Sequence, residues 1–413
     1  MKDNSSIETD RQQREETEEE TKRLGLVPSP ELPEDIANSV SEDLSDLLSR
    51  YVDDRVTWEV EVVADPLIGV AGDSLKILDE TERCKQEEGW EYAVCITDLP
   101  IFHNRRLVVA DASVKRNVAM ISLPSLGATP MKRRVREAII QLANEMYHGS
   151  SEQARRSQQK QTKERDSEDD SQNIRGQGAK QLMGQRLAER MSPIKRKTYD
   201  EDSEFDVRFL VDSKISGSIR MTSGMVLANR PWTIFPSFKR VVAGAFATGA
   251  YGLIFPTLWL LSGAYGIPRF MILMITAMSA MVIWIIVAHH LWETVKEGSS
   301  RYLVRLYNIA TALTLIVGVL FYYSVLFLLF LIAVSIFVPA GLLESELGHE
   351  VSFADYVSLA WLTTSIATVV GAVGAGLESE ETVLKTTYGY RQRRRKEWQK
   401  QQEKEANNNT SSD

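Results

Sequence analysis

The chain has 413 residues, of which 44% are hydrophobic and 25% charged, and its formal net charge at pH 7 is -8. This acidic balance argues against nucleic acid as a partner. The two cysteines, Cys84 and Cys95, exclude a disulfide framework and lack the paired spacing of a zinc site, so both are expected to be buried.

Residues 1–30 are predicted to form a disordered acidic leader, because they carry too little apolar surface to offset the entropy of ordering. No positively charged stretch followed by an apolar run opens the chain, so the sequence predicts no signal peptide. The soluble part is therefore expected to remain in the cytosol.

Residues 31–148 are predicted to form a cytosolic α/β domain with a mixed sheet. Apolar residues recur at helical spacing after Pro33, and an alternating segment that ends at Pro66 indicates a strand. A strand, a helix, three strands and a helix within about 90 residues indicate one sheet with helices packed on it. The expected elements are a helix at 34–48, a strand at 58–67, a helix at 73–88, strands at 92–99, 106–113 and 118–123, and a helix at 132–147.

Residues 149–204 are dominated by charged residues, Ser and Gln, and are predicted to be a flexible linker that transmits little strain between the parts it joins. Residues 205–240 are predicted to hold one more strand and a segment for the membrane interface. Aromatic side chains stand there beside Arg220 and Arg230, as is typical of the headgroup level.

Residues 241–377 are predicted to form a transmembrane helical bundle. Four segments with few or no charges are long enough to cross a hydrocarbon layer about 30 Å thick. These segments are residues 241–262, 270–288, 306–343 and 356–377. The third is longer than one upright crossing requires, so it is either one tilted or broken helix or two crossings.

The basic residues of the loops favour four crossings over five. The loop at 344–355 has no Lys or Arg, whereas basic residues precede the first segment, follow the second (Lys296, Arg301 and Arg305) and lie in the basic tail at 378–413. Four crossings place both termini in the cytosol and the loop at 344–355 outside the cell membrane. The residues expected to fix this topology and to contact anionic lipid headgroups are Lys239, Arg240, Arg391, Arg393, Arg394, Arg395 and Lys396.

Small residues in the first and last segments permit close contact between helices, either within the bundle or between two copies of the chain. These residues are Gly244, Gly249, Ala367, Gly371 and Ala375. The segments have no ionisable side chain at mid-depth, which disfavours an active transporter.

The sequence contains no glycine-rich nucleotide fingerprint, no phosphate-binding loop and no nucleophile elbow. It therefore predicts no cofactor and no catalytic or metal-binding residue. An enzymatic alternative would use an acidic pocket formed by Asp65, Asp98 and Asp111, provided that the ends of their strands align. The three residues are otherwise expected to serve in turns and caps.

The chain resembles a family of bacterial polytopic membrane proteins with an N-terminal cytosolic α/β domain and no established activity. The resemblance covers about residues 30–396. Some relatives are labelled as folate-linked dehydrogenases, a label for which this sequence has no cofactor fingerprint. The motifs that carry the resemblance are WEVEVVADPL, CITDLPIF, VVADAS, VAMISLPSLG, ANRPW and GLESEETVLKTTYGYRQRRR.

The order ITDLPIF, VVADAS, VAMISL and a helix opening VREA more remotely resembles archaemetzincin-type zinc peptidases. In that family the helix carries H-E-x-x-H, in which two imidazoles hold Zn²⁺ and the Glu activates its water. The matching positions here are Ile140, Gln141 and Asn144, and His148 is not at the spacing of a third ligand. The resemblance thus implies a catalytically dead zincin-like domain that binds a partner along its sheet edge.

Three classes of function follow from these observations, in this order. The first is a membrane-tethered binding, scaffold or sensor protein, with a protein partner or homo-oligomer expected. A membrane-bound enzyme is the second, and a transport component is the third.

Overall fold

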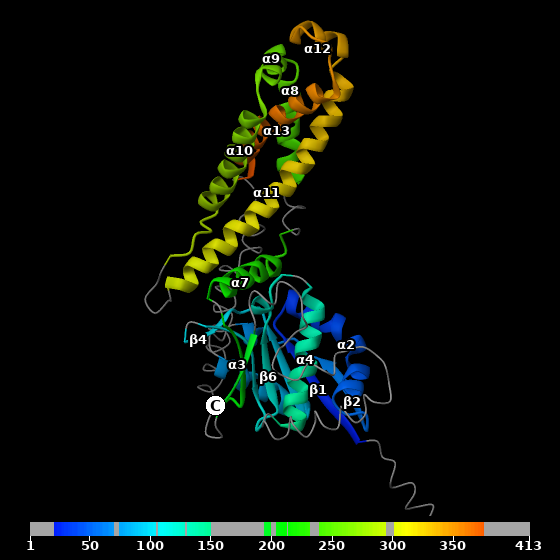
Figure 1. Ribbon diagram of the computed structural model, residues 1–413, viewed down its shortest axis with the longest axis vertical. Helices are drawn as coiled ribbons and strands as arrows, with labels where there is room; N and C mark the ends of the chain where they lie inside the picture. Colours follow the sequence, from blue (N-terminus) through cyan, green and yellow to red (C-terminus); the bar gives the residue numbers. More distant parts are fainter. Residues whose placement is uncertain are drawn as a thin grey trace, which may run out of the picture. The chain divides into compact units, whose positions relative to one another are not determined.

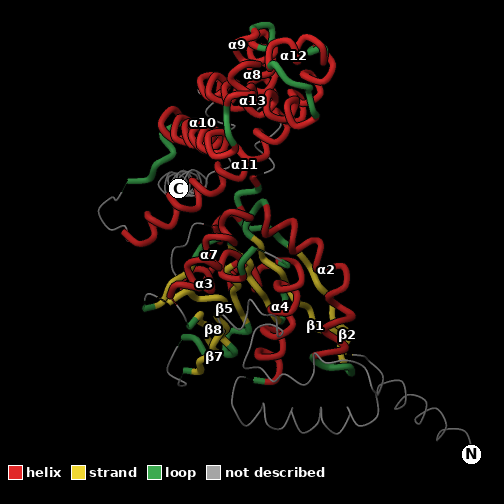
Figure 2. Tube along the Cα trace, turned by 45° about the horizontal axis from the view of Figure 1, so that its top comes forward, coloured by secondary structure: helices red, strands yellow, loops and turns green. Residues whose placement is uncertain are grey.

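The computed structural model describes residues 20–69, 74–104, 106–128, 130–149, 194–199, 204–212, 214–231, 239–294 and 301–375. The chain divides into two compact units. The first comprises residues 1–224 and 395–413, and the second comprises residues 225–394. Strands lie only in the first unit among the described residues, and the described part of the second is helices and loops (Figures 1 and 2).

The first unit is built on one eight-stranded mixed sheet, as the sequence predicts, with the strand order β2-β1-β3-β6-β5-β8-β7 and with β4 paired to β5. The strands β2, β1, β3 and β6 are parallel, whereas β5, β8 and β7 run antiparallel to their neighbours. The strands are β1 (Glu20–Pro28), β2 (Val56–Val62), β3 (Tyr92–Thr97), β4 (Ile101–His103), β5 (Arg106–Ser113), β6 (Val118–Ser122), β7 (Ile194–Thr198) and β8 (Val207–Val211).

Three α-helices cover the two faces of the sheet: α2 (Leu32–Tyr51), α3 (Ser74–Glu88) and α4 (Met131–His148). On β3, Ala93 and Cys95 share a buried cluster with residues of α3. The alternate residues Val94 and Ile96 point to the opposite face, because side chains alternate along a strand. There α2 and α4 lie side by side (Figure 1).

Strand β1 corrects the prediction of a disordered leader for residues 20–28. It lies between β2 and β3 in parallel ladders, and Leu24, Leu26 and Val27 are fully buried. The charged start and Gly25 conceal this strand in the sequence. Gly25 is needed because a Cβ there would lie 1.7 Å from Cε3 of Trp90, whose ring fills the space of the missing side chain. Residues 1–19 lie outside the described part of the chain.

Strand β7 corrects the linker prediction at its C-terminal end. Residues 194–198 pair antiparallel with β8, although the segment reads IKRKT. Arg196 is buried in an ion pair, whereas Lys195 and Lys197 are exposed on the other face of the strand. The strand therefore places no unpaired charge in the core. The segment 150–193 therefore connects α4 to β7, and both of these elements belong to the α/β unit. It is not the tether between the α/β domain and the bundle.

The chain instead leaves the sheet after β8 through α7 (Lys214–Ala228), a helix within the segment predicted for the membrane interface. Gly224 of α7 lies against the short helix η2 (Leu123–Leu126), since a Cβ there would be 2.3 Å from the carbonyl oxygen of Pro124. This part of the predicted interfacial segment therefore belongs to the α/β unit.

The second unit is a helical bundle in which α10, α11 and α13 are each long and apolar enough to cross a membrane. The pair α8 and α9 passes the same test jointly, but it bends by 92°. The described residues thus contain three such helices, or four if the bent pair is one span. The helices are α8 (Lys239–Gly252), α9 (Pro256–Ala264), α10 (Ile267–Ala288), α11 (Arg301–Phe337), α12 (Ala340–Leu347) and α13 (Phe353–Ala375).

Two of the predicted spans differ in detail from the structure. The predicted straight span at 241–262 is broken before Pro256, because proline cannot continue the hydrogen-bonding of the preceding turn. The segment at 306–343 is one helix to Phe337 and then breaks at Pro339, in agreement with a single long, broken helix rather than two crossings.

Helix α13 packs against α8, α9, α10 and α11, and it is the least apolar of the three long helices. Its buried hydroxyl groups explain this. Thr363, Thr364 and Thr368 donate to carbonyl oxygens four residues earlier in the helix, at 2.7–2.8 Å. Because these bonds are made within the helix, the polar side chains are accommodated in an apolar interior.

Candidate functional site

Buried polar side chains gather where the parallel strands β1, β3 and β6 end. Ser29 Oγ donates to Asp98 Oδ1 at 3.3 Å, and Ser122 Oγ donates to the Leu99 carbonyl oxygen at 2.6 Å. Ser125 Oγ donates to Ser122 Oγ at 2.9 Å. The carboxyl edge of parallel strands is where ligands bind in open α/β sheets. Here, however, these groups are at most 1% exposed and bond to one another, so they form part of the interior.

Asp65, Glu80 and Cys84 lie together beside that edge. Asp65 follows β2, whereas Glu80 and Cys84 stand one turn apart on α3, and the ligand atoms of all three lie within 4.8 Å of one another. Among the residues that the structure describes, no other group of three His, Cys, Asp or Glu side chains could share an ion. Arg83 Nη2 lies 3.2 Å from Asp65 Oδ2 and 2.5 Å from Glu80 Oε1.

The Arg83 guanidinium therefore already forms ion pairs with both carboxylates of this group. Burial, with a hydrogen bond to Asp65, raises the pKa of the Cys84 thiol to about 12, so the sulfur is protonated at neutral pH. Cys84 Sγ donates to Asp65 Oδ2 at 3.2 Å. A protonated thiol and a bound guanidinium make this an ion-paired connection between β2 and α3.

Asp111 lies within the sheet rather than at its edge. Its carboxylate accepts two hydrogen bonds from Arg208 of β8, at 2.7 and 2.9 Å, and the two side chains are 0% and 4% exposed. Burial raises the pKa of Asp111, and the guanidinium opposes this shift. The ring of Phe205 stacks 4.3 Å from Arg208 Cζ.

Each carboxylate of the acidic pocket in the enzymatic alternative has a partner of its own in the structure. Asp65 bonds to Arg83 and Cys84, Asp98 bonds to Ser29, and Asp111 bonds to Arg208. Asp111 pairs with Arg208 between β5 and β8, two residues before the end of β5. The sequence around the three aspartates did not indicate that each of them bonds to a different partner.

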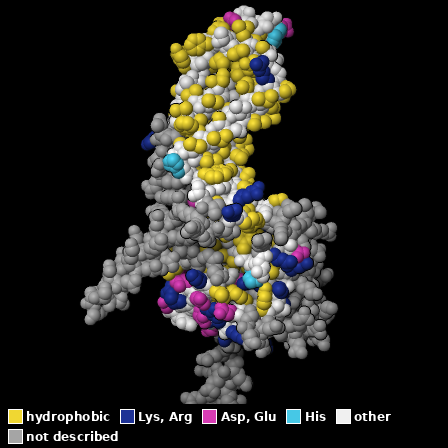
Figure 3. Space-filling model, turned by 90° about the vertical axis from the view of Figure 1, so that its left-hand side faces the viewer, with side chains coloured by type: hydrophobic (Ala, Val, Ile, Leu, Met, Phe, Trp, Pro, Cys, Tyr) yellow, Lys and Arg dark blue, Asp and Glu magenta, His cyan; other side chains and the backbone are white. Residues whose placement is uncertain are grey.

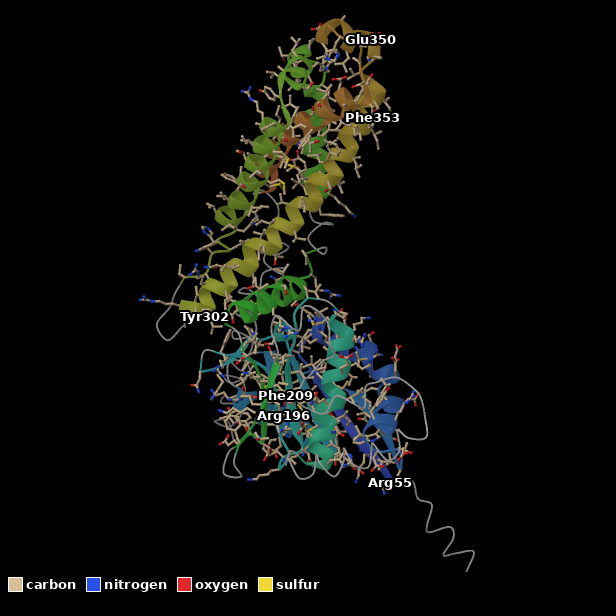
Figure 4. The ribbon with its side chains drawn as sticks, in the orientation of Figure 1. Arg55, Arg196, Phe209, Tyr302, Glu350 and Phe353 are labelled. Carbon is tan, nitrogen blue, oxygen red and sulfur yellow. The ribbon has the colours of Figure 1, made fainter. Side chains whose placement is uncertain are left out.

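Helix α4 carries the positions that match the zincin motif. Gln141 stands at the position of the catalytic Glu, and its Nε2 atom is buried with no hydrogen-bond partner in the described structure. His148 Nε2 lies 3.0 Å from the carbonyl oxygen of Val52. Glu145 forms a buried double ion pair with Arg196 of β7, at 2.6 and 2.9 Å, and Figure 4 shows Arg196 within the sheet region. Glu145 thus attaches α4 to β7, the strand at one edge of the sheet.

The small residues predicted for helix packing fall into two groups. At Gly249 a Cβ would lie 2.2 Å from Phe330 Cζ and 3.1 Å from Ala367 Cβ. At Gly371 it would lie 2.3 Å from the hydroxyl of Tyr322. Gly244, in contrast, is exposed, and no described atom lies within 4 Å of a Cβ built there. Ala375 ends α13, and its side chain is not described.

The contacts of α13 define the directions of its neighbours. Gly249 faces Ala367 and Ala245 faces Gly371, so α8 runs antiparallel to α13. Tyr323 bonds to Ser365 at 2.8 Å while Tyr322 contacts Gly371, which makes α11 antiparallel as well. The rings of Phe270 and Trp361 stack 5.3 Å apart, near the beginnings of α10 and α13. Helices α8, α10, α11 and α13 therefore alternate in direction.

This alternation separates charges between the two ends of the bundle. One end, which we call the basic end, has Lys239, Arg240, Arg301 and Arg305, all of them exposed. The other, the acidic end, has Glu344, Glu346, Glu350 and Asp355, together with one arginine, Arg269. Figure 4 shows Tyr302 at the first end and Glu350 and Phe353 at the second. The predicted basic residues from Arg391 to Lys396 lie outside the described part.

Buried amides near the basic end were not found by sequence reasoning. Asn229 Nδ2 donates to Thr314 Oγ1 at 2.8 Å. The side-chain amide of Asn308 bonds to both the amide nitrogen and the carbonyl oxygen of Glu293, at 2.8 and 3.0 Å. Asn308 therefore fixes the chain after α10 to the side of α11. The position of Asn308 near the start of a long apolar segment could have indicated this site in the sequence.

The fold defines a class of protein: an α/β domain with a mixed sheet, followed by a bundle with three helices, or four, that could cross a membrane. No family model matches the chain, no curated protein matches it, and no solved structure matches it.

Proposed function

We propose that the chain is a multi-pass protein of the cell membrane that tethers a cytosolic α/β domain for binding, scaffolding or sensing. The observation that carries the proposal is the lipid-like exterior of the bundle, charged only near its two ends. The domain's role as a binding module rests on the absence of a catalytic group at the described positions that match the zincin motif.

The exterior of the bundle supports insertion into lipid. Ile272 and Ile283 of α10 are 64% and 60% exposed, and Leu328 and Ile332 of α11 are 56% and 58% exposed. Figure 3 shows hydrophobic side chains over most of the visible face of this unit. Exposed apolar area costs about 25 cal/mol per Å² in water, and this cost is removed when the surface meets lipid.

The charge separation supports four crossings with the basic end in the cytosol. Arg301 and Arg305 precede the apolar part of α11, and Lys239 and Arg240 begin α8 at the same end. Because loops rich in Lys and Arg stay in the cytosol, both termini are proposed to lie there. Anionic headgroups are the proposed lipid partners of these residues and of the tail arginines, at about 1 kcal/mol for each basic residue.

The binding role of the α/β domain is supported by its sheet edge and by helix α4. Strand β2 ends the sheet and pairs with β1 alone among the described strands, which is the arrangement that accepts an added peptide strand. On α4, Gln141 donates hydrogen bonds but cannot act as a general base, and Ile140 cannot bind zinc.

Metal analysis tests the inactive-peptidase part of the proposal. The full chain, purified in detergent and dialysed against zinc at micromolar concentration, is expected to retain no stoichiometric zinc. The reason is that Ile140, Gln141 and Asn144 replace the two imidazoles and the Glu of the motif. Elemental analysis of the protein measures this directly. About one zinc per chain would overturn the proposal, and a Cys84→Ser variant would then report whether the Asp65 group holds the ion.

A further inference from the structure

Helix α8 is too short to cross the membrane by itself. Its 14 residues give about 21 Å of helix, whereas the hydrocarbon core is about 30 Å thick. If α8 begins at the basic end with Lys239, it stops before the far surface of the core. The bend at residues 253–255 and the start of α9 therefore fall inside the lipid layer or at its boundary.

The backbone hydrogen bonds at the bend are suited to surroundings without water. Leu253 and Phe255 donate their backbone N–H groups to the carbonyl oxygens of Gly249 and Gly252, both at 3.1 Å. The Leu253 carbonyl oxygen, which the broken helix would leave unpaired, accepts a hydrogen bond from Trp259 Nε1 at 3.0 Å. Because lipid offers no hydrogen bonds, a break is tolerated there only when its backbone groups are satisfied within the protein.

The outward face of α9 carries no charge. Trp259 and Ser262 are buried against the bundle, whereas Leu260 and Leu261 are 46% and 41% exposed. Helix α12 lies against α9, since a Cβ at Gly263 would be 2.6 Å from Leu347 Cδ2. Yet α12 exposes Glu344 and Ser345 as well as Leu342. The exposed side chains of the two adjoining helices therefore differ. Those of α9 are apolar and suit contact with lipid, whereas those of α12 include polar groups that suit the boundary between lipid and water.

A tyrosine directly after α9 and an arginine in the first turn of α10 are typical of the headgroup level. The Arg269 guanidinium lies 4.2 Å from the centre of the Tyr265 ring, and Arg269 is exposed. Basic and aromatic side chains are typical of the membrane interface. From this level the 22 residues of α10 give about 33 Å of helix, enough for a complete crossing.

We infer that α9 is an in-plane helix embedded in the lipid leaflet at the acidic end of the bundle, with Leu260 and Leu261 against the acyl chains. Together α8 and α9 then make one crossing, in which α8 spans most of the core and α9 lies along its far boundary. This inference rests on the proposed function, since it requires that the bundle spans a membrane. It also excludes a water-exposed loop between α8 and α10.

Spin labels at single introduced cysteines test the inference in the full chain, reconstituted in liposomes. The variants are Leu260→Cys on α9, Leu328→Cys in the middle of α11 and Ser345→Cys on α12. The unmodified chain serves as the background control, because Cys84 and Cys95 are buried. The measured quantity is the ratio of collisions with oxygen, which concentrates in lipid, to collisions with a water-soluble nickel chelate.

The label at Leu260 is expected to show a ratio several-fold above that at Ser345 and below that at Leu328, because α9 lies nearer the boundary of the core than the middle of α11 does. A ratio at Leu260 equal to that at Ser345, with Leu328 in lipid, would overturn the in-plane helix alone. A water-like ratio at Leu328 would instead contradict the proposed membrane protein. Leu261→Cys, on the next position of the same helix, repeats the measurement if Leu260→Cys does not fold.

Discussion

Replacing Asp111 with alanine should lower the free energy of unfolding of the α/β domain by about 3–5 kcal/mol. The substitution leaves Arg208, only 4% exposed, with its guanidinium buried and without the carboxylate that accepts two of its hydrogen bonds. An unpaired buried charge costs far more than the ion pair contributes. Urea unfolding of the full chain in detergent, followed by pulse proteolysis of the α/β domain, measures the change.

Two controls separate this effect from a general sensitivity of the domain. Arg133→Gln removes an exposed pair with Glu137, in which Arg133 is 52% exposed, and should change the free energy by less than about 1 kcal/mol. The double replacement Asp111→Leu with Arg208→Met should recover much of the loss, because it buries no charge. A loss below about 1 kcal/mol for Asp111→Ala would contradict the buried pair.

Replacing Gly249 with valine should destabilise the bundle by about 1–3 kcal/mol or more. The added Cβ would lie 2.2 Å from Phe330 Cζ and 3.1 Å from Ala367 Cβ, so α8 must move away from α11 and α13. Phe330 is fully buried and cannot turn aside without displacing its neighbours. Thermal unfolding of the chain in detergent measures the change.

Gly244→Val is the matched control on the same helix. It makes the same chemical change at an exposed position with no atom within 4 Å of the new Cβ, and is expected to leave the midpoint of unfolding nearly unchanged. Equal loss in the two variants would contradict the contact of α8 with α11 and α13. Loss of a dimer in Gly244→Val alone would place Gly244 at an interface between two copies.

The elements that the sequence predicts well are those with one dominant signal. Strands β3 and β6 are largely apolar runs that are buried on both faces, β5 contains the apolar run 107–110, and helix α4 has a clear apolar period. Strand β1 was missed because its Lys22 and Arg23 interrupt the pattern, although its partners on both sides bury it. Strand β7 was missed because the buried Arg196 pairs with Glu145, which lies 51 residues earlier in the chain.

The candidate sites were harder to predict, because they depend on which face of an element is covered. Small residues recur along α8, but the sequence does not say that Gly249 faces α11 while Gly244 faces outward. In the same way, the sequence does not say that Asp98, directly after β3, bonds to Ser29 while Asp111, within β5, bonds to Arg208. The bend before Pro256 was also missed, because hydropathy counts apolar residues without their direction.

Accessibility of two introduced cysteines tests most directly the claim that the chain crosses the cell membrane four times with both termini in the cytosol. Ser345 lies on α12 at the acidic end, and Ser411 lies in the basic tail outside the described residues. In intact cells a membrane-impermeant thiol reagent is expected to label Ser345→Cys, and to label Ser411→Cys only after permeabilisation. Labelling of both cysteines from outside would contradict the four-crossing account.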